Sequence, residues 1–557
     1  MSVKTGRFRF SILRDSDEAG QVRLRMSISR RTFLLGSAAL AATGWMNDSP
    51  RGVLGATETA NTSRRSLGIY VHTHWSYNHP YCARTWTEEA WHGYLRGLAH
   101  LGYDTLMFWP LLDCMPAEPT PSDAAFLAKI GRVIRFAQSE MGLQFIVVAC
   151  PNTIGNAKAP QYVFEKRPYF VCEHKVNPKN RADVRAFLEG RRAQFEPIAH
   201  ANALAIIDSD PGGYIGSTNE EFVDLMAGQI EVFRSFNRQA ELYYWMLDGW
   251  ENYNRFWAEA QRQTAGGPPP VLRIELSAFE QTLSAMKRKI AEPWGVLALS
   301  AEHVKATDEL GLGDKRLFFP YGIVEGEPSF PLTNFDPKAC AAVMQYLKGS
   351  RYPRGFMANA QTHVLQLPNT FFIAEAFRNG ANPSDLAGFG ESVLPGTGMA
   401  LAMAWGAISA ADASAQREAS VKLRERLTTE PDKLRATGPC SGLLFGDPNR
   451  FINDLAENLL LRAATSDLAS ASAAGKDPRP TLRAMLNILR PYQQRVGFND
   501  ACGGPLTGTL NGVLAGLHDP DIDRILARVS EWKDLPARHG VIVPLLDAAQ
   551  SYCDRHP

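Results

Sequence analysis

Two acidic residues with a spacing suited to proton transfer lie in the first half of the chain. Asp208 and Asp210 follow the apolar run 203–207 and precede a Pro-Gly-Gly turn. Side chains two residues apart in an extended strand point to the same face. Because two such carboxylates repel each other, we expect at least one to have a raised pKa and to stay protonated near neutral pH. The pattern predicts an acid/base centre, and the alternative is that either aspartate caps the following turn.

A second alternating pair of acids, Glu325 and Glu327, follows a later apolar run. If the two pairs lie on opposite sides of one site, they supply the two carboxylates that hydrolysis of a glycosidic bond requires, one as the acid and the other as the nucleophile or base. Asp248 and Glu251 are further candidates for these roles. The alternative for the glutamates is a solvated loop.

Polar and aromatic residues follow other apolar runs as well. Flat aromatic rings can stack on the apolar faces of pyranoses, while imidazole, amide and guanidinium groups can hydrogen-bond to hydroxyls. The alternative is burial in the core, which we expect for about half of the aromatic residues. The residues that we expect to bind a sugar are His72, His74, Trp75, Tyr77, Arg84, Trp109, Asn152, Trp250, Glu251, Tyr321, Asn359, Gln361 and His363.

From residue 66 onward, short apolar runs alternate with amphipathic stretches. Eight strands with helices between them predict an α/β fold, a (β/α)8 barrel over 66–383 with its eighth helix after residue 369. A doubly wound open sheet is the alternative, but no glycine-rich nucleotide-binding motif supports it. We expect strands at 67–72, 103–109, 143–150, 203–208, 242–247, 295–299, 316–321 and 355–358.

The stretches between these strands predict the helices. Thr218 with Glu221 predicts a capping box at the start of one of them. In a (β/α)8 barrel the chemistry lies at the carboxyl ends of the strands, where the candidate residues above would therefore meet. We expect helices near 87–101, 122–141, 181–198, 219–237, 277–291, 303–311 and 336–349.

The layout of residues 66–380 resembles the (β/α)8-barrel glycoside hydrolases, in the broad sense shared by the hexosaminidase-like and retaining β-glycosidase groups. Hexosaminidases of family 20 carry an adjacent Asp-Glu after strand four, whereas Ser209 separates Asp208 from Asp210 here. The retaining groups carry glutamates after strands four and seven, and here only the seventh position has them. The resemblance implies a hydrolase of oligo- or polysaccharides; a barrel that binds sugar without cleaving it is another possibility.

The pair His72 and His74 supports a different hypothesis. Two histidines two positions apart after a first strand resemble the metal-binding opening of amidohydrolase-type barrels, in which His303 and His363 would be further zinc ligands. The sequence departs from that pattern, because the fifth run offers no histidine, the fourth no lysine, and Asn359 or Gln361 stands where an aspartate is expected. We therefore expect no cofactor, with zinc as the alternative.

The two ends of the chain differ from the barrel region. Residues 384–557 are rich in Ala and Leu with a helical period, and they predict a helical C-terminal region with a low-complexity link at 466–480. Residues 1–60 contain Arg30 and Arg31 before a short run of small and apolar residues, which is similar to a twin-arginine export signal. We therefore expect a periplasmic or secreted protein, whose start is either Met1 or Met26.

The charge and composition of the chain disfavour some classes of binding partner. Eleven of the 59 Lys and Arg residues and five of the 58 acidic residues lie in 1–65, so that segment carries +6 and residues 66–557 carry −5. A mildly acidic mature chain disfavours nucleic acid as a partner, and no apolar stretch is long enough for a membrane-spanning helix. The eight cysteines are widely spaced and include no C-x-x-C pair, which gives no indication of a cysteine-based metal or redox site.

Overall fold

Eight parallel strands close into a barrel. The computed structural model describes residues 13–16, 22–25, 65–73, 77–209, 211–263, 269–320, 331–346, 351–360, 364–379, 385–429, 437–501 and 504–556. Around the barrel the strands follow their chain order, and β12 pairs with β3 to close it. The strands are β3 Ser66–Val71, β4 Thr105–Phe108, β5 Gln144–Ala149, β8 Ala203–Ile207, β9 Glu241–Trp245, β10 Trp294–Ala298, β11 Arg316–Phe318 and β12 Gly355–Ala360.

The strands are short, nearly continuous apolar runs because both of their faces are buried. All five residues of β8 and all six of β12 are buried, with the barrel interior on one side and the helices on the other. Each strand predicted from the sequence overlaps one observed strand, and each end differs by no more than three residues. The predicted (β/α)8 barrel is confirmed.

Helices surround the barrel, and side-chain caps mark where several of them begin. Thr218 and Glu221 form the predicted capping box of α5, and Thr120 with Asp123 forms another at the start of α3. The helices of this layer are α2 Glu88–His100, α3 Pro121–Met141, α4 Arg181–Phe195, α5 Asn219–Arg234, α6 Trp250–Arg262, α7 Leu276–Lys289, α8 Ala301–Glu309, α9 Pro337–Tyr346 and α10 Leu367–Asn379.

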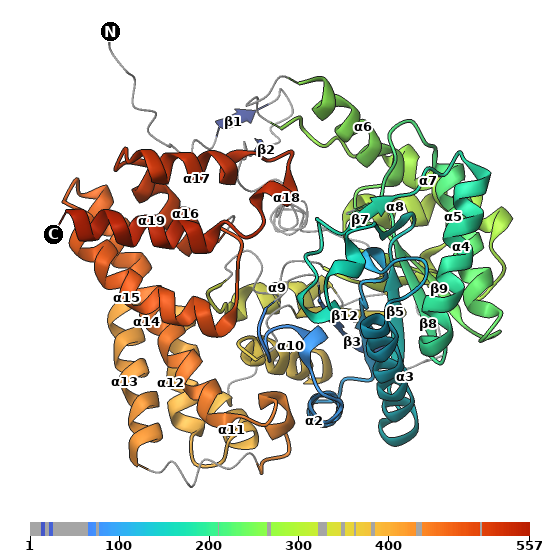
Figure 1. Ribbon diagram of the computed structural model, residues 1–557. Coiled ribbons are helices and arrows are strands. Elements are labelled where there is room, and N and C mark those ends of the chain that lie inside the picture. Colours follow the sequence, from blue (N-terminus) through green and yellow to red (C-terminus); the bar gives the residue numbers. More distant parts are fainter. Residues whose placement is uncertain are drawn as a thin grey trace.

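The C-terminal region is helical, as predicted, and it packs beside the barrel (Figure 1). Its apolar residues belong to the same continuous core as those of the barrel, from Leu67 to Cys553. The helices are α11 Leu386–Val393, α12 Gly398–Ala410, α13 Ala413–Thr429, α14 Pro448–Ala473, α15 Arg479–Val496, α16 Pro505–Ala515, α17 Pro520–Ser530, α18 Leu535–Arg538 and α19 Ile542–Arg555.

The prediction of a low-complexity link at 466–480 was wrong. Helix α14 continues to Ala473 and α15 begins at Arg479, so only 474–478 connects them. The run of Ala and Ser that suggested a link has an adequate helix propensity, and the partner helices α13 and α15 supply the packing that the composition alone did not reveal.

Short strand pairs lie outside the barrel. β1 Leu13–Ser16 pairs with β2 Val22–Arg25, and β6 Thr153–Gly155 pairs with β7 Glu173–Lys175.

The twin-arginine motif lies outside the described residues. Among the described residues, the cysteines are free and buried, and no helix is both long and apolar enough to span a bilayer.

Candidate active site

Four aromatic side chains meet at the carboxyl end of the barrel. The Trp245 ring lies 5.4 Å from that of Tyr70, 5.9 Å from Trp109 and 4.9 Å from Phe319, each in an edge-on arrangement. We call Tyr70, Trp109, Trp245 and Phe319 the inner aromatic cluster. They come from β3, β9 and the residues just after β4 and β11, and all are almost completely buried. This end of a (β/α)8 barrel is where enzymes of the fold carry out their chemistry.

Three residues predicted from the sequence to bind a ligand belong to this cluster or border it. Trp109 is a member, and the His72 ring lies 5.9 Å from that of Tyr70. Asn359 pairs with Tyr70 in the register of β12 and β3, so the two side chains face the same side of the sheet. Tyr70 and Phe319 were not predicted. The alternation along β3, with Tyr70 two residues before His72, is the signal that could have indicated Tyr70.

Asp208 is fully buried and holds the turn that follows β9. Its carboxylate accepts hydrogen bonds from the Tyr244 hydroxyl at 2.7 Å and from the backbone N–H groups of Leu247 and Asp248 at 3.2 and 3.1 Å. Burial raises the pKa of Asp208 to about 6, although these hydrogen bonds oppose the shift. Asp208 is therefore an acid that changes its protonation state close to neutral pH.

The Asp208 carboxylate lies on the outer side of the barrel wall, not on the side of the aromatic cluster. Tyr244 and Trp245 are consecutive in β9 and so point to opposite faces. Trp245 joins the inner cluster, while the Tyr244 ring lies 5.7 Å from that of Phe222 in α5. Because Asp208 bonds to Tyr244, its carboxylate lies on the same outer side as α5. From there it also accepts the two backbone N–H groups of the turn between β9 and α6. The sequence predicted that Asp208 shares its face with Asp210, which lies outside the described residues.

Asp248 connects the ends of two neighbouring strands. Its carboxylate accepts a hydrogen bond from the Ser209 hydroxyl at 3.3 Å, and its own backbone N–H donates to Asp208. The Asp248 side chain is buried. The residues after β8 and β9 are thus held together by Asp208 and Asp248 as a pair.

Two predicted sugar-binding residues, Trp250 and Glu251, instead begin helix α6. The Trp250 ring is fully buried, stacks on Phe222 at 5.1 Å and donates from Nε1 to the Ser217 hydroxyl at 2.8 Å. Glu251 accepts a hydrogen bond from the backbone N–H of Asn219 at 2.8 Å, at the first residue of α5. The sequence did not predict α6, and its amphipathic period turns Trp250 into the core.

Arg84, Tyr77 and Asn152 are also buried. Arg84 donates to the carbonyls of Phe164 and Arg167 at 3.1 and 3.0 Å, which makes it a structural residue of the neighbouring loop. Asn152 donates from Nδ2 to the carbonyls of Val176 and Gly213 at 2.9 and 3.2 Å. Tyr77 is 4% exposed. Arg84 and Asn152 thus bind the backbone of the loops after the strands, and contact of the three side chains with a ligand stays a prediction from the sequence.

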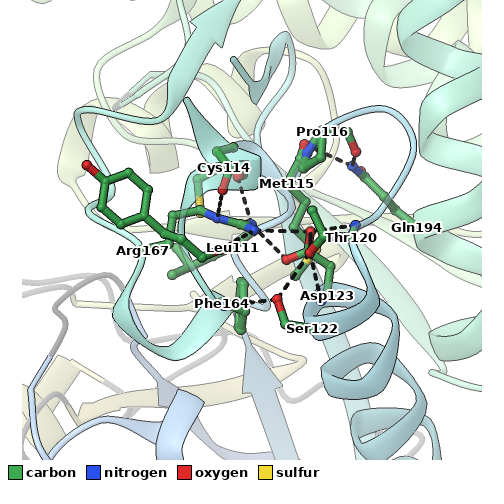
Figure 2. Close-up of polar contacts among 12 residues, drawn as sticks. Leu111, Cys114, Met115, Pro116, Thr120, Ser122, Asp123, Phe164, Arg167 and Gln194 are labelled. Atoms are coloured by element: carbon green, nitrogen blue, oxygen red, sulfur yellow. Dashed lines mark hydrogen bonds and ion pairs between the residues drawn. The ribbon is translucent and has the colours of Figure 1, made fainter. Parts of the chain in front are cut away.

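A buried ion pair fixes the loops after β4 and β5 (Figure 2). Arg167 binds Asp123 through two hydrogen bonds of 2.7 and 3.2 Å, and both side chains are fully buried. Arg167 also donates to the Cys114 carbonyl at 3.0 Å, and Asp123 caps helix α3 through Thr120. A second buried pair, Arg191 with Asp113, lies beside the Trp109 indole, which donates to Asp113 at 2.6 Å.

His303, one of the alternative zinc ligands, is a helix-capping residue. Its Nδ1 accepts hydrogen bonds from the backbone N–H groups of Leu299 and Ser300 at 3.0 and 3.4 Å. A hydrogen bond with the Leu247 backbone raises the pKa of the imidazole, but burial outweighs it and lowers the pKa to about 3. Within the described ranges, no three His, Cys, Asp or Glu side chains are grouped to hold a metal ion.

Eight of the predicted site residues lie outside the described residues. Their predicted roles stay predictions from the sequence. They are His74, Trp75, Asp210, Tyr321, Glu325, Glu327, Gln361 and His363.

A cavity of about 450 Å³ opens at the opposite, amino-terminal end of the barrel. Its lining includes the first residues of β3, β4 and β5, which are Ser66, Thr105 and Gln144. Arg354 forms an ion pair with Glu241 there. The position is at the other end of the strands from the candidate site residues, and among the lining side chains Ser66 bonds to Thr105 and Arg354 to Tyr243.

No protein-family model matches the chain, and no curated protein matches it. Solved structures match at low identity. A family 89 glycoside hydrolase from Clostridium perfringens is 11% identical, with coverage of 88% of this chain and 64% of that one and a TM-score of 0.43. The Flavobacterium johnsoniae chitobiase is also 11% identical, with coverage of 88% and 74% and a TM-score of 0.35.

An O-GlcNAc hydrolase from Thermobaculum terrenum is 11% identical as well, with coverage of 86% of this chain and 99% of that one and a TM-score of 0.33. The similarity to these structures is one of fold. The barrel that the sequence predicted is shown by the strand order of this chain itself.

Proposed function

We propose that the protein is a glycoside hydrolase that cleaves an oligo- or polysaccharide by carboxylate acid/base chemistry. The observation that carries the proposal is the closed parallel barrel, in which Asp210 follows β8 and Glu325 and Glu327 follow β11 in the sequence. The carboxyl ends of the strands form the end of this fold at which chemistry takes place, and paired acids suit the cleavage of a glycosidic bond.

The roles follow from the position of each acid in the sequence. Asp210, three residues after the end of β8, is the proposed acid. Glu325 or Glu327, after β11, is the proposed nucleophile or base, since strands four and seven lie across a barrel from each other. Asp208 and Asp248 hold the neighbouring turns, and His72 and Asn359 contact the sugar beside the aromatic cluster. No metal takes part in this proposal.

We also propose that the chain is exported to the periplasm or secreted through the twin-arginine route. The support is the pair Arg30 and Arg31 before a short run of small and apolar residues, together with the excess of basic residues in 1–65. Fusion of residues 1–65 to a reporter, with and without replacement of both arginines by lysine, tests this. Export that is insensitive to the replacement would contradict it.

The test of the activity is a glycan panel with products followed by NMR, comparing the wild type with Asp210→Asn and with a matched control, Asp467→Asn. The Asp467 side chain is 45% exposed on α14 and pairs with Arg417. We expect the wild type and the control to cleave the same glycan, and Asp210→Asn to lose at least about a hundredfold in kcat with binding largely retained.

Other outcomes point to the alternatives. Binding of a glycan that neither the wild type nor any variant cleaves would indicate a carbohydrate-binding barrel. Stoichiometric zinc in the purified protein, with a hydrolytic activity that a chelator abolishes, would indicate the amidohydrolase-like alternative and would overturn the proposal.

A further inference from the structure

Two polar side chains of helix α14, Asp454 and Asn458, are fully buried although the helix lies in the C-terminal region. They are four residues apart and so lie on the same face of the helix, one turn from each other. Buried polar groups remain in folded proteins when they are hydrogen-bonded. The partners of these two connect α14 with loops at the carboxyl end of the barrel.

Asp454 binds the loop that follows β3. The Tyr81 hydroxyl donates a short hydrogen bond to its Oδ2, and Arg495 of α15 donates to Oδ1 at 2.9 Å. Burial and the Asp454 charge raise the pKa of the Tyr81 phenol well above its usual value, so Tyr81 stays a donor. A carboxylate paired with both partners joins the loop, α14 and α15.

The same loop is bound a second time at the end of α15. The Asn78 backbone N–H donates to the Val496 carbonyl at 2.8 Å. The Asn78 side chain donates to the carbonyls of Gln494 and Arg495 at 3.0 and 3.2 Å. These carbonyls belong to the last turn of α15, whose backbone acceptors have no partners within the helix. Asn78 therefore supplies the C-cap of this helix from the barrel side.

Asn458 binds the chain that returns to the barrel after β11. Its Oδ1 accepts a hydrogen bond from the Thr333 N–H at 3.0 Å, and its Nδ2 donates to the Pro331 carbonyl at 3.1 Å and to the Tyr492 hydroxyl at 2.8 Å. Arg462, one turn further along α14, donates to the Thr333 carbonyl. Both an N–H donor and two carbonyl acceptors of the backbone at 331–333 are thus hydrogen-bonded to side chains of α14.

We propose that Asp454 and Asn458 are positioning residues of the active site, and that helix α14 sets the relative placement of residues 77–81 and 331–333, which follow strands β3 and β11 in the chain. The inference rests on the proposed function. Phe319 belongs to the inner aromatic cluster and His72 borders it, and residues 77–81 and 331–333 further along the same two connections bond to α14 and α15. A displacement of one of these loops by 1 Å can reduce turnover about a hundredfold while leaving ground-state binding almost unchanged.

The test combines amide hydrogen exchange and kinetics on the full-length protein. Asn458→Ala removes the acceptor of the Thr333 N–H, and Tyr81→Phe removes only the hydroxyl that reaches Asp454. The matched control is Asp467→Asn, an exposed ion-pair residue of the same helix. We expect exchange in a peptide covering 331–335 to rise about tenfold in Asn458→Ala, and exchange in 77–86 to rise in Tyr81→Phe, with the barrel strands unchanged.

On the glycan that the wild type cleaves, we expect kcat to fall about tenfold in either variant, with KM within about threefold and no change in the control. Exchange that is unaltered in these segments, or a KM and kcat equal to those of the wild type, would overturn the inference. If Asn458→Ala does not fold, Tyr81→Phe decides alone, since it removes a single oxygen. A wild type that cleaves no glycan while the exchange changes as expected would contradict the proposed function, and α14 would then only stabilise the loops.

Discussion

The Tyr244 hydroxyl donates a hydrogen bond of 2.7 Å to Asp208 behind the wall of the barrel, on the side of β9 that faces α5. Through this contact and two backbone N–H groups, one buried carboxylate holds the turn from which α6 begins. Two opposing effects act on the same acid, since burial disfavours its charge and the hydrogen bonds favour it.

Asp208 should make stability depend on pH. Its pKa of about 6 in the folded protein lies above the ordinary 3.8, so the folded state holds the proton more tightly than the unfolded state. The stabilisation is present in full below about pH 4 and is lost as the pH rises through about 6, a change of about 3 kcal/mol. Asp208→Asn cannot titrate, so its free energy of unfolding should differ from the wild-type value by an amount that changes over this range.

Denaturant unfolding at several pH values between about 4 and 8 measures this difference, with Asp467→Asn as the exposed control. Wild-type and Asp208→Asn curves that run parallel across the range would show that Asp208 does not titrate there.

Tyr244→Phe should raise the pKa of Asp208 further, because a hydrogen bond to the ionised form is lost. The cost in the free energy of unfolding should be about 1 to 3 kcal/mol at pH 8, where Asp208 is charged, and smaller at pH 4. The matched control is Tyr103→Phe, whose buried hydroxyl donates to the neutral Thr370 carbonyl at 2.8 Å. An equal cost for Tyr244→Phe at both pH values would argue against a charged Asp208.

Arg167→Met should destabilise the protein by about 3 to 5 kcal/mol, because it leaves the Asp123 carboxylate buried without its cation. The control is Arg132→Met, which breaks an ion pair with Glu88 whose side chains are 50% and 28% exposed. That change should cost no more than about 1 kcal/mol. Chemical unfolding of both variants measures the difference. A similar decrease in the free energy of unfolding for the two would show that burial does not make the Arg167 pair more important for stability.

Gly497→Ala should disturb the contact between α15 and the loop after β3. Gly497 has a φ of +79°, and a Cβ there would lie 2.8 Å from the Asn78 side chain. Gly540 has a φ of +77° with nothing within 4 Å, so Gly540→Ala measures the backbone cost alone, about 1 kcal/mol. Gly497→Ala should cost at least about 1 kcal/mol more. Equal melting shifts for the two variants would show that Asn78 moves aside freely.

The barrel could be predicted from the sequence because buried parallel strands are short apolar runs and several helices begin at recognisable caps such as Thr218. Helix α6 was missed because its first turn, with Trp250 and Glu251, carries residues that also suit a ligand site. The burial of Arg84 was equally hidden, since its partners are backbone carbonyls of Phe164 and Arg167.

The orientation of side chains at the strand ends was the hardest part to predict. A register of one residue decides whether Asp208 faces the interior or the helices, and the sequence pattern shows only that the strand is apolar. The roles of Asp454 and Asn458 had no local signal at all, because their partners lie far away in the chain.

Tyr81 meets Asp454 across 373 residues of sequence. During synthesis, the Tyr81 hydroxyl therefore cannot reach this partner until the chain as far as α14 has left the ribosome. Contacts this distant in sequence form late and slow the acquisition of the native state. The barrel end beside β3 is completed only when α14 arrives, so a nascent or truncated chain would have this end unfinished.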